Sequence, residues 1–162
     1  FHHEDMFLLE EPNWDYLYKL EQMVRSGDVD IVKLIKGSYD KNTHIEYTKN
    51  LYVNPNNLLF AIQPSLIKTS DLRKIYKYTK GNTIWEFEEN SSSLVSYLNL
   101  KSCYYYENTE NKRGEFHWDS AIYPYIATAV VKGKWDFASY PMELPKILHQ
   151  YSINPALRGT NE

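Results

Sequence analysis

The sequence predicts an α+β fold in a single domain, with a mostly antiparallel sheet, an N-terminal helical hairpin and further short helices. Three observations support this prediction. Apolar residues recur every three to four positions near the N-terminus, they alternate with polar ones after residue 43, and the elements do not alternate as in a parallel α/β fold. The chain has 162 residues, the size of one ordinary domain. We therefore expect one domain over 1–162, with loose ends at 1–10 and 152–162.

Two helices are expected first, at 13–26 and 28–36. Asn13 is a good N-cap for the first helix, and Gly27 stands where a left-handed residue would end it. The second helix carries apolar residues at helical spacing and stops at Gly37. Together the two helices are expected to form an antiparallel hairpin.

The middle of the chain is expected to supply strands. Residues 43–53 alternate between apolar and polar side chains, which predicts a strand with one buried face. Residues 58–62 form a short apolar run typical of a central strand, and residues 83–88 alternate again. A helix is expected between these two strands, from Ser70 to about Lys80.

The last third of the chain mixes both element types. Aromatic residues at the end of 94–106 favour a strand, and β-like character resumes at 115–118 after a polar loop. A short helix is expected at 144–151. Residues 120–132 fit either a helix that begins at Pro124 or a strand rich in β-branched residues, and we favour the helix.

Charge and apolar content exclude several functional classes. The chain carries 18 Lys and Arg against 21 Asp and Glu, a formal net charge of −3, whereas nonspecific nucleic-acid binders usually carry a basic excess. No apolar run approaches the ~20 residues that cross a bilayer. We therefore expect a cytoplasmic protein that binds neither nucleic acid nor membrane. A local basic group is interpreted as the solvated face of a helix, and it comprises Lys68, Arg73, Lys74, Lys77 and Lys80.

Aromatic residues are abundant, with 15 Tyr, 4 Trp and 6 Phe. An AT-rich genome would raise Tyr together with Asn and Lys, which are also frequent here. The alternative is a binding face, because tyrosine is enriched at protein interfaces. Its expected residues combine aromatic and acidic side chains: Tyr104, Tyr105, Tyr106, Glu107, Glu110, Glu115 and Trp118.

Such an acidic, aromatic face suits a basic protein partner. Immunity proteins and inhibitors that mimic the anionic substrate of a nuclease work in this way. The motifs with fixed catalytic spacing are absent from the sequence: there is no phosphate-binding glycine loop, no His-Glu-x-x-His and no Gly-x-Ser-x-Gly. The lone Cys103 is expected to be structural. We therefore expect an inhibitor, immunity or regulatory protein that acts by protein binding, without a cofactor.

A metal-dependent enzyme is the main alternative. His117 and Asp119 lie two residues apart, and His149 and Arg158 follow downstream. This arrangement resembles the His-x-Asp…His…Arg-x-Ser/Thr pattern of the Fe(II)/2-oxoglutarate dioxygenases. The resemblance, which covers residues 117–160, implies that His117, Asp119 and His149 bind Fe(II) or another divalent metal and that Arg158 anchors a cosubstrate. A metal-dependent hydrolase on the same three ligands is a related possibility.

A small-ligand-binding domain is the third possibility. In that case an apolar cavity would be lined by Trp85, Phe87 and tyrosines.

Overall fold

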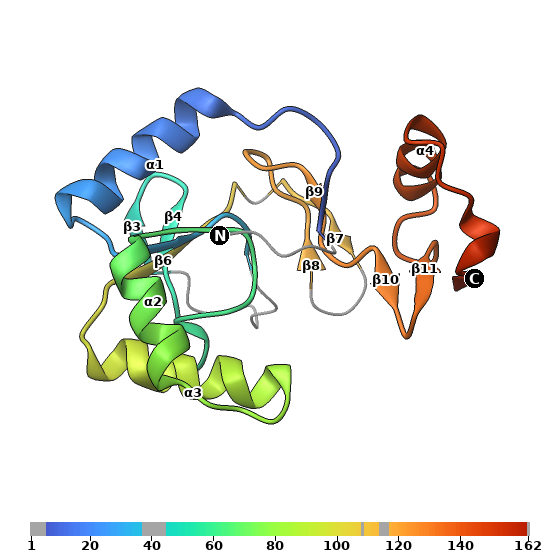
Figure 1. The fold of residues 1–162 in the computed structure, drawn as a ribbon. Helices are drawn as coiled ribbons and strands as arrows, with labels where there is room; N and C mark the ends of the chain where they lie inside the picture. The colour runs from blue at the N-terminus through green and yellow to red at the C-terminus, as the bar shows by residue number, and fades with distance from the viewer. Residues whose placement is uncertain (1–5, 37–44, 108, 114–116, 162) are drawn as a thin grey trace.

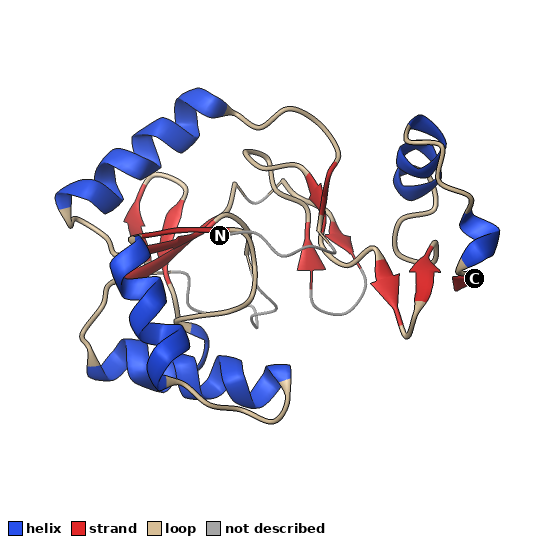
Figure 2. Ribbon diagram, in the orientation of Figure 1, coloured by secondary structure: helices blue, strands red, loops and turns tan. Residues whose placement is uncertain are grey.

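The structure is a computed structural model that describes residues 6–36, 45–107, 109–113 and 117–161. Its elements make an α+β fold around a central sheet, which confirms the predicted fold class. Figure 2 shows helices on both sides of this sheet. Within the described ranges, no helix has the length and apolar character needed to cross a membrane.

Helices cover both faces of the central sheet (Figure 1). Helix α1 (Trp14–Ser26) packs its apolar stripe on one face, and α2 (Thr69–Tyr78) and α3 (Ile84–Tyr97) cover the opposite face. Helix α4 (Glu143–Gln150) packs with the C-terminal strands instead. Two apolar layers therefore enclose the sheet, and the burial of their surface drives this part of the fold.

The central sheet has five strands in the order β3-β4-β6-β2-β5. Neighbouring strands β2 and β6 are parallel, and the other three pairings are antiparallel. The sheet is therefore mixed, with mostly antiparallel pairing as expected. The strand bounds are β2 Ile31–Lys33, β3 Glu46–Thr48, β4 Leu51–Val53, β5 Ser65–Ile67 and β6 Ser102–Tyr105.

Smaller sheets occupy the rest of the described chain. Their strands are β1 Phe7–Leu8 with β9 Tyr125–Ile126, β7 Lys112–Arg113 with β8 His117–Trp118, and β10 Val130–Val131, β11 Lys134–Asp136 and β12 Thr160–Asn161. Strand β1 pairs antiparallel with β9, and β12 pairs parallel with β11. Both terminal segments, which the sequence suggested were loose, thus contribute paired strands.

The first predicted helix is confirmed with its two end signals. The Asn13 side chain accepts a hydrogen bond from the Tyr16 N–H at 3.1 Å, as an N-cap does. Gly27 ends α1 with a φ of 85°, a conformation that glycine adopts without steric cost. The buried stripe consists of Leu17, Leu20 and Val24.

Residues 28–36 differ from the prediction, because they form strand β2 rather than the second helix of a hairpin. Val32 packs toward α1 on one face of the sheet, while Ile31 packs toward α2 and α3 on the other. Both side chains are buried, as expected for a central strand. A short run that is apolar on both faces fits a buried helix and a buried strand equally well. The spacing of its apolar residues therefore does not distinguish the two.

The prediction of a strand at 83–88 is wrong, because these residues lie at the start of α3. The Thr83 hydroxyl accepts a hydrogen bond from the Glu86 N–H at 3.2 Å, and the Glu86 carboxylate accepts from the Asn82 N–H at 2.8 Å. This pattern is close to a capping box, which fixes a helix N-terminus. The sequence contains a helix N-terminus signal, Thr83-x-x-Glu86. The alternation of apolar and polar residues at 83–88 favoured a strand instead.

Residues 58–62 also differ from the predicted strand. A short 3₁₀ helix, η1 (Asn56–Leu58), leads into a turn that runs to β5. Side chains from β2 and α3 satisfy the backbone of this turn, as described below, so it needs no strand partner. The apolar run is buried because it packs under α3.

The remaining elements agree with the predictions for some segments and differ for others. The single strand predicted over 43–53 is instead a hairpin of β3 and β4, joined by a turn in which Asn50 has a φ of 63°, and residues 43 and 44 lie outside the described residues. Strand β6, strand β8, helix α2 and helix α4 confirm the predictions for their segments. The favoured helix at 120–132 is wrong, because β9 and β10 lie there and agree with the β-branched residues.

Candidate functional site

The tyrosine run 104–106 lies in the interior. The exposed fractions of Tyr104, Tyr105 and Tyr106 are 2%, 1% and 5%. Tyr105 points toward α1, where its ring centroid lies 5.0 Å from that of Tyr16. Tyr104 stacks on Tyr52 of the neighbouring strand at 5.6 Å between centroids. These three side chains are core residues and present no exposed face.

The acidic side chains beside them bind groups of their own chain. The Glu107 carboxylate accepts a hydrogen bond from the Tyr105 hydroxyl. The Glu110 carboxylate accepts from the backbone N–H groups of Glu107 at 2.8 Å and Thr109 at 2.9 Å. Glu115 lies outside the described residues. The two described carboxylates therefore help to shape their loop.

Trp118 takes part in an internal cation–π cluster. The Lys36 ammonium group lies 4.4 Å from the centroid of the Tyr106 ring and 4.5 Å from that of Trp118. Burial lowers the pKa of Lys36, and the nearby Glu110 carboxylate opposes this shift. The cluster holds a cation of this chain, so these rings are not free to receive one from a partner.

Of the candidate metal ligands, Asp119 is paired, His149 is exposed and the His117 side chain is not described. The Asp119 carboxylate accepts from Arg113 Nε at 3.0 and 3.2 Å, and Arg113 Nη2 donates to Glu143 at 2.8 Å. His149 is exposed on α4, and the His117 side chain lies outside the description. In the part of the chain that the structure describes, no group of three His, Cys, Asp or Glu side chains could hold one metal ion.

Arg158 and Cys103, the two remaining candidate residues, contact or lie among other residues of the fold. The Arg158 guanidinium lies 5.2 Å from the centroid of the Trp135 ring and donates to the Gly133 carbonyl at 3.4 Å. Cys103 is buried, and burial raises the pKa of its thiol to about 11. A neutral, buried thiol is a poor nucleophile, which agrees with the structural role expected for this residue.

An exposed aromatic and basic surface lies instead on α2 and α3. We call it the α2–α3 face, and it comprises Arg73, Lys74, Tyr76, Lys77, Tyr78, Lys80, Ile84 and Trp85. Tyr78 and Trp85 are 63% and 61% exposed, and Ile84 and Tyr76 are 49% and 47% exposed. Trp85 therefore faces solvent, whereas the third possibility required it to line a cavity.

Helical geometry brings the cations and the aromatic side chains together. Arg73, Tyr76 and Lys77 follow the spacing of one face of α2, because residues three and four apart are neighbours on a helix, and Lys80 follows two residues after the helix ends. Ile75 is fully buried and fixes the rotation of α2 on the core. This rotation leaves the basic and aromatic stripe on the outside.

The connection between α2 and α3 packs closely against α3. Gly81 approaches α3 so closely that a Cβ atom would lie 2.5 Å from the Phe87 nitrogen. Asn90 Nδ2 donates to the Lys80 carbonyl at 2.7 Å. Phe87 anchors α3 with ring contacts to Tyr76 at 5.2 Å and Phe60 at 6.3 Å between centroids. These contacts hold the α2–α3 face in one arrangement.

The named side chains of this surface include four cations, and the exposed carboxylates Glu86 and Glu89 lie on α3 as well. Lys74 pairs with Asp71 at 2.8 Å, and Lys77 lies 5.1 Å from the centroid of the Tyr78 ring. Arg73 and Lys80 are exposed. The sequence identified the basic residues but assigned them to a solvated face. It missed the aromatic ones because their exposure depends on how α2 and α3 pack.

Comparisons with known protein families, curated proteins and solved structures found no match to this chain.

Proposed function

We propose that this chain is a regulatory or inhibitory protein that binds another protein through its α2–α3 face, and that the partner presents an acidic, partly apolar segment. The observation that carries the proposal is the pair of large aromatic side chains, Tyr78 and Trp85, which stand more than 60% exposed on either side of one rigid connection. Tyrosine, tryptophan and arginine are the residues most enriched at binding hot spots.

The charge pattern supports an acidic partner. Arg73, Lys77 and Lys80 are exposed on α2 and on the connection to α3, and Lys77 contacts the Tyr78 ring; complementary charge increases the rate and specificity of association. This reverses the basic partner that the sequence suggested. The change follows because the Glu107 and Glu110 carboxylates accept hydrogen bonds from groups of their own chain.

A protein partner is favoured over nucleic acid. Glu86 and Glu89 are exposed on α3, the helix that carries Trp85, and they would repel phosphates. The formal net charge of −3 also opposes nonspecific binding to a polyanion. An acidic peptide can avoid these two carboxylates, whereas a regularly charged backbone cannot.

The proposal can be tested with a synthetic peptide of Glu-Glu-Leu repeats. We expect the peptide to shift the amide resonances of the α2–α3 face, while a Lys-Lys-Leu peptide of equal length leaves them unchanged. Trp85→Ala should weaken binding at least fivefold, as a hot-spot residue does. Trp14→Ala is the matched control, because Trp14 is 53% exposed on α1, on the opposite side of the sheet.

Charge reversal on the α2–α3 face provides a second test of peptide binding. Lys77→Glu combined with Lys80→Glu should abolish binding of the acidic peptide, whereas the exposed pair Lys19→Glu and Lys49→Glu should leave it unchanged. Equal binding of both peptides, or equal loss in both double variants, would contradict the proposal. Tighter binding of a 12-residue oligothymidylate than of the acidic peptide would assign the face to nucleic acid.

A further inference from the structure

Residues 8–18, which lead into α1 and form its first turn, make a second exposed surface that we call the acidic segment. Its large apolar side chains Leu8, Trp14 and Tyr18 are 45%, 53% and 65% exposed. Three exposed carboxylates accompany them: Glu10, Glu11 and Asp15. No Lys, Arg or His occurs within the segment. It therefore has the acidic, partly apolar character that the proposed function requires of a partner of the α2–α3 face.

The carboxylates of the acidic segment have no cation of their own chain beside them. Within the described residues, no ion pair involves Glu10, Glu11 or Asp15. The α2–α3 face shows the opposite charge in the same state, because Arg73 and Lys80 are exposed and form no ion pair in the described part of the chain. Contact between the two surfaces would pair charges that both leave open.

The acidic segment is held in its conformation by the rest of the fold. The Leu9 N–H donates to the Pro124 carbonyl at 3.0 Å, and the Asn13 N–H donates to the Ile122 carbonyl at 2.9 Å. Trp14 and Tyr18 follow on α1 four residues apart, so their side chains lie on the same side of the helix. A surface ordered in advance loses little conformational entropy when a partner binds it.

The central sheet separates the acidic segment from the α2–α3 face of the same molecule (Figure 1). Helix α1 packs on one face of the sheet, and α2 and α3 pack on the other. The segment therefore cannot reach the α2–α3 face of its own chain, but it can reach that of another copy. Because the two contact surfaces differ, such an interface is heterologous, and each copy keeps one surface open for the next copy.

We propose that the α2–α3 face binds the acidic segment of a second copy of this chain. The aromatic side chains of the segment pack on Tyr78 and Trp85, and its carboxylates lie toward Arg73 and Lys77 of α2. The exposed carboxylates of α3 direct those of the segment to the α2 side. This inference rests on the proposed function, because it names the partner of the same face.

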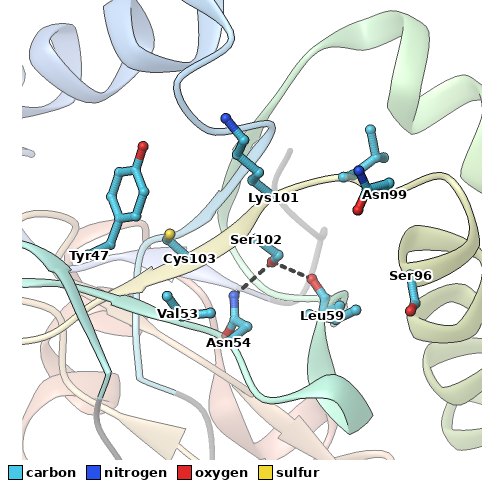
Figure 3. A pocket seen from close by; sticks show the side chains of 10 residues that line it. Tyr47, Val53, Asn54, Leu59, Ser96, Asn99, Lys101, Ser102 and Cys103 are labelled. Carbon is cyan, nitrogen blue, oxygen red and sulfur yellow. Dashed lines mark hydrogen bonds between the residues drawn. The ribbon is translucent and has the colours of Figure 1, made fainter.

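A hollow beside α3 is a less suitable place for the acidic segment (Figure 3). The Asn54 amide group donates to the Ser102 hydroxyl at 2.7 Å, so these two lining groups already bind each other. Lys101, which also lines the hollow, donates its backbone N–H to the Asp30 carboxylate at 2.8 Å and its ammonium group to the Asp28 carbonyl at 3.4 Å. Carboxylates of the segment would meet Asp30 there, so we assign the docking to the α2–α3 face.

Sedimentation velocity of the unaltered chain measures the self-association directly. A concentration range of about 10–500 µM covers weak and transient complexes. We expect the average sedimentation coefficient to rise with concentration beyond the value of a dimer, because a heterologous interface does not stop at two copies. An excess of the Glu-Glu-Leu peptide should dissociate these assemblies, since it occupies the α2–α3 face.

Two variants that are disabled on opposite surfaces should complement each other. Glu10→Lys with Glu11→Lys reverses the charge of the acidic segment and keeps the α2–α3 face, whereas Tyr78→Ala with Trp85→Ala keeps the segment and removes the aromatic side chains of the face. Each double variant alone should sediment as a monomer. Their equimolar mixture should form a dimer that grows no further, because it holds one intact face and one intact segment.

Two further variants separate this contact from general effects. Asp28→Lys with Glu46→Lys changes the net charge by the same amount at exposed positions outside both surfaces, so it should associate as the unaltered chain does. Trp14→Ala should weaken self-association roughly fivefold or more while it leaves binding of the Glu-Glu-Leu peptide unchanged. It also carries the test if the double lysine variant of the segment does not fold.

The outcomes distinguish this inference from the proposed function. A chain that binds the Glu-Glu-Leu peptide but sediments as a monomer up to about 500 µM would overturn the inference and leave the proposed function in place. A chain that binds neither the peptide nor another copy would overturn both. Undiminished self-association of either disabled variant, or no dimer in their mixture, would overturn the assignment of the contact to these two surfaces.

Discussion

Lys33 and Glu88 hold the two ends of one turn in the interior. The Lys33 ammonium group donates to the Leu58 carbonyl at 3.0 Å, and the Glu88 carboxylate accepts from the Ile62 N–H at 2.6 Å. Between them, Ser92 Oγ accepts from the Phe60 N–H and donates to the Phe60 carbonyl, both at 3.2 Å. Side chains of β2 and α3 thus replace the strand partner that residues 58–62 would otherwise need.

The Lys33–Glu88 arrangement should make stability depend on pH. Burial lowers the pKa of Lys33 to about 7, while the Glu88 carboxylate opposes the shift. Between pH 7 and the ordinary lysine pKa, the unfolded chain binds more protons than the folded one, so the free energy of unfolding rises with pH. The Lys33 contribution should be roughly 2 kcal/mol between pH 7 and 9. Urea unfolding at several pH values measures it.

Lys33→Met is the control for that pH dependence. The substitution removes the titrating group, so the rise between pH 7 and 9 should disappear. Tyr104, which pairs with Lys33 across the sheet, does not interfere in this window, because burial raises its pKa to about 12. An equal rise in both proteins would show that another group titrates.

Arg113 should stabilise the link between β7 and α4. Its guanidinium bridges Asp119 and Glu143, and all three side chains are about three-quarters buried. Arg113→Met leaves two carboxylates without their cation and should lower the free energy of unfolding by about 1–3 kcal/mol. Arg25→Met removes an exposed pair with Glu21 and should change it by less than about 0.5 kcal/mol. If Arg113→Met and Arg25→Met lower the free energy of unfolding equally in urea, the bridge contributes no more than an exposed ion pair.

Gly81 should be essential to the shape of the α2–α3 face. A Cβ atom there would lie 2.5 Å from Phe87 N and 2.8 Å from Phe87 Cα, so Gly81→Ala must displace α3. We expect a loss of about 1–3 kcal/mol and shifted resonances at Tyr76 and Phe87. Gly133→Ala meets no atom within 4 Å but has a φ of +81°, so it should cost about 1 kcal/mol and leave those resonances in place.

Thr83 should determine where α3 begins. Its hydroxyl caps the Glu86 N–H, so Thr83→Ala should cost about 1 kcal/mol, whereas Thr83→Ser keeps the cap and most of the stability. Ser93→Ala removes a hydroxyl from the exposed middle of the same helix and serves as the reference. Thermal unfolding of the three variants distinguishes capping from general loss of a hydroxyl, because only Thr83→Ala should lower Tm clearly.

Cys103 should react only after unfolding. It is 2% exposed, and burial raises the pKa of its thiol to about 11, so little thiolate exists at pH 8. A disulfide reagent should modify the folded protein slowly and the urea-unfolded protein at once. Rapid modification of the folded protein at pH 8 would show that the sulfur is accessible in the folded state.

The candidate surface was accessible to sequence reasoning only in part. The Ser70 cap and the spacing of Leu72 and Ile75 are visible in the sequence and predict α2, and the basic residues predict its solvated side. Whether Tyr78 and Trp85 face solvent or core is not encoded locally, since it depends on the burial of Ile75 and on the close contact at Gly81. Exposure is a property of packing between helices.

The sequence by itself determined the ends of α1, because Asn13 and Gly27 act on their nearest neighbours. It also favoured a strand at the end of 94–106, where β6 (Ser102–Tyr105) lies. Only the tertiary structure decided that Tyr104 and Tyr105 are both buried, because β6 lies inside the sheet with α1 on one face and aromatic rings on the other. Strand residues point to alternate faces, so burial of both needs cover from segments far away in the chain.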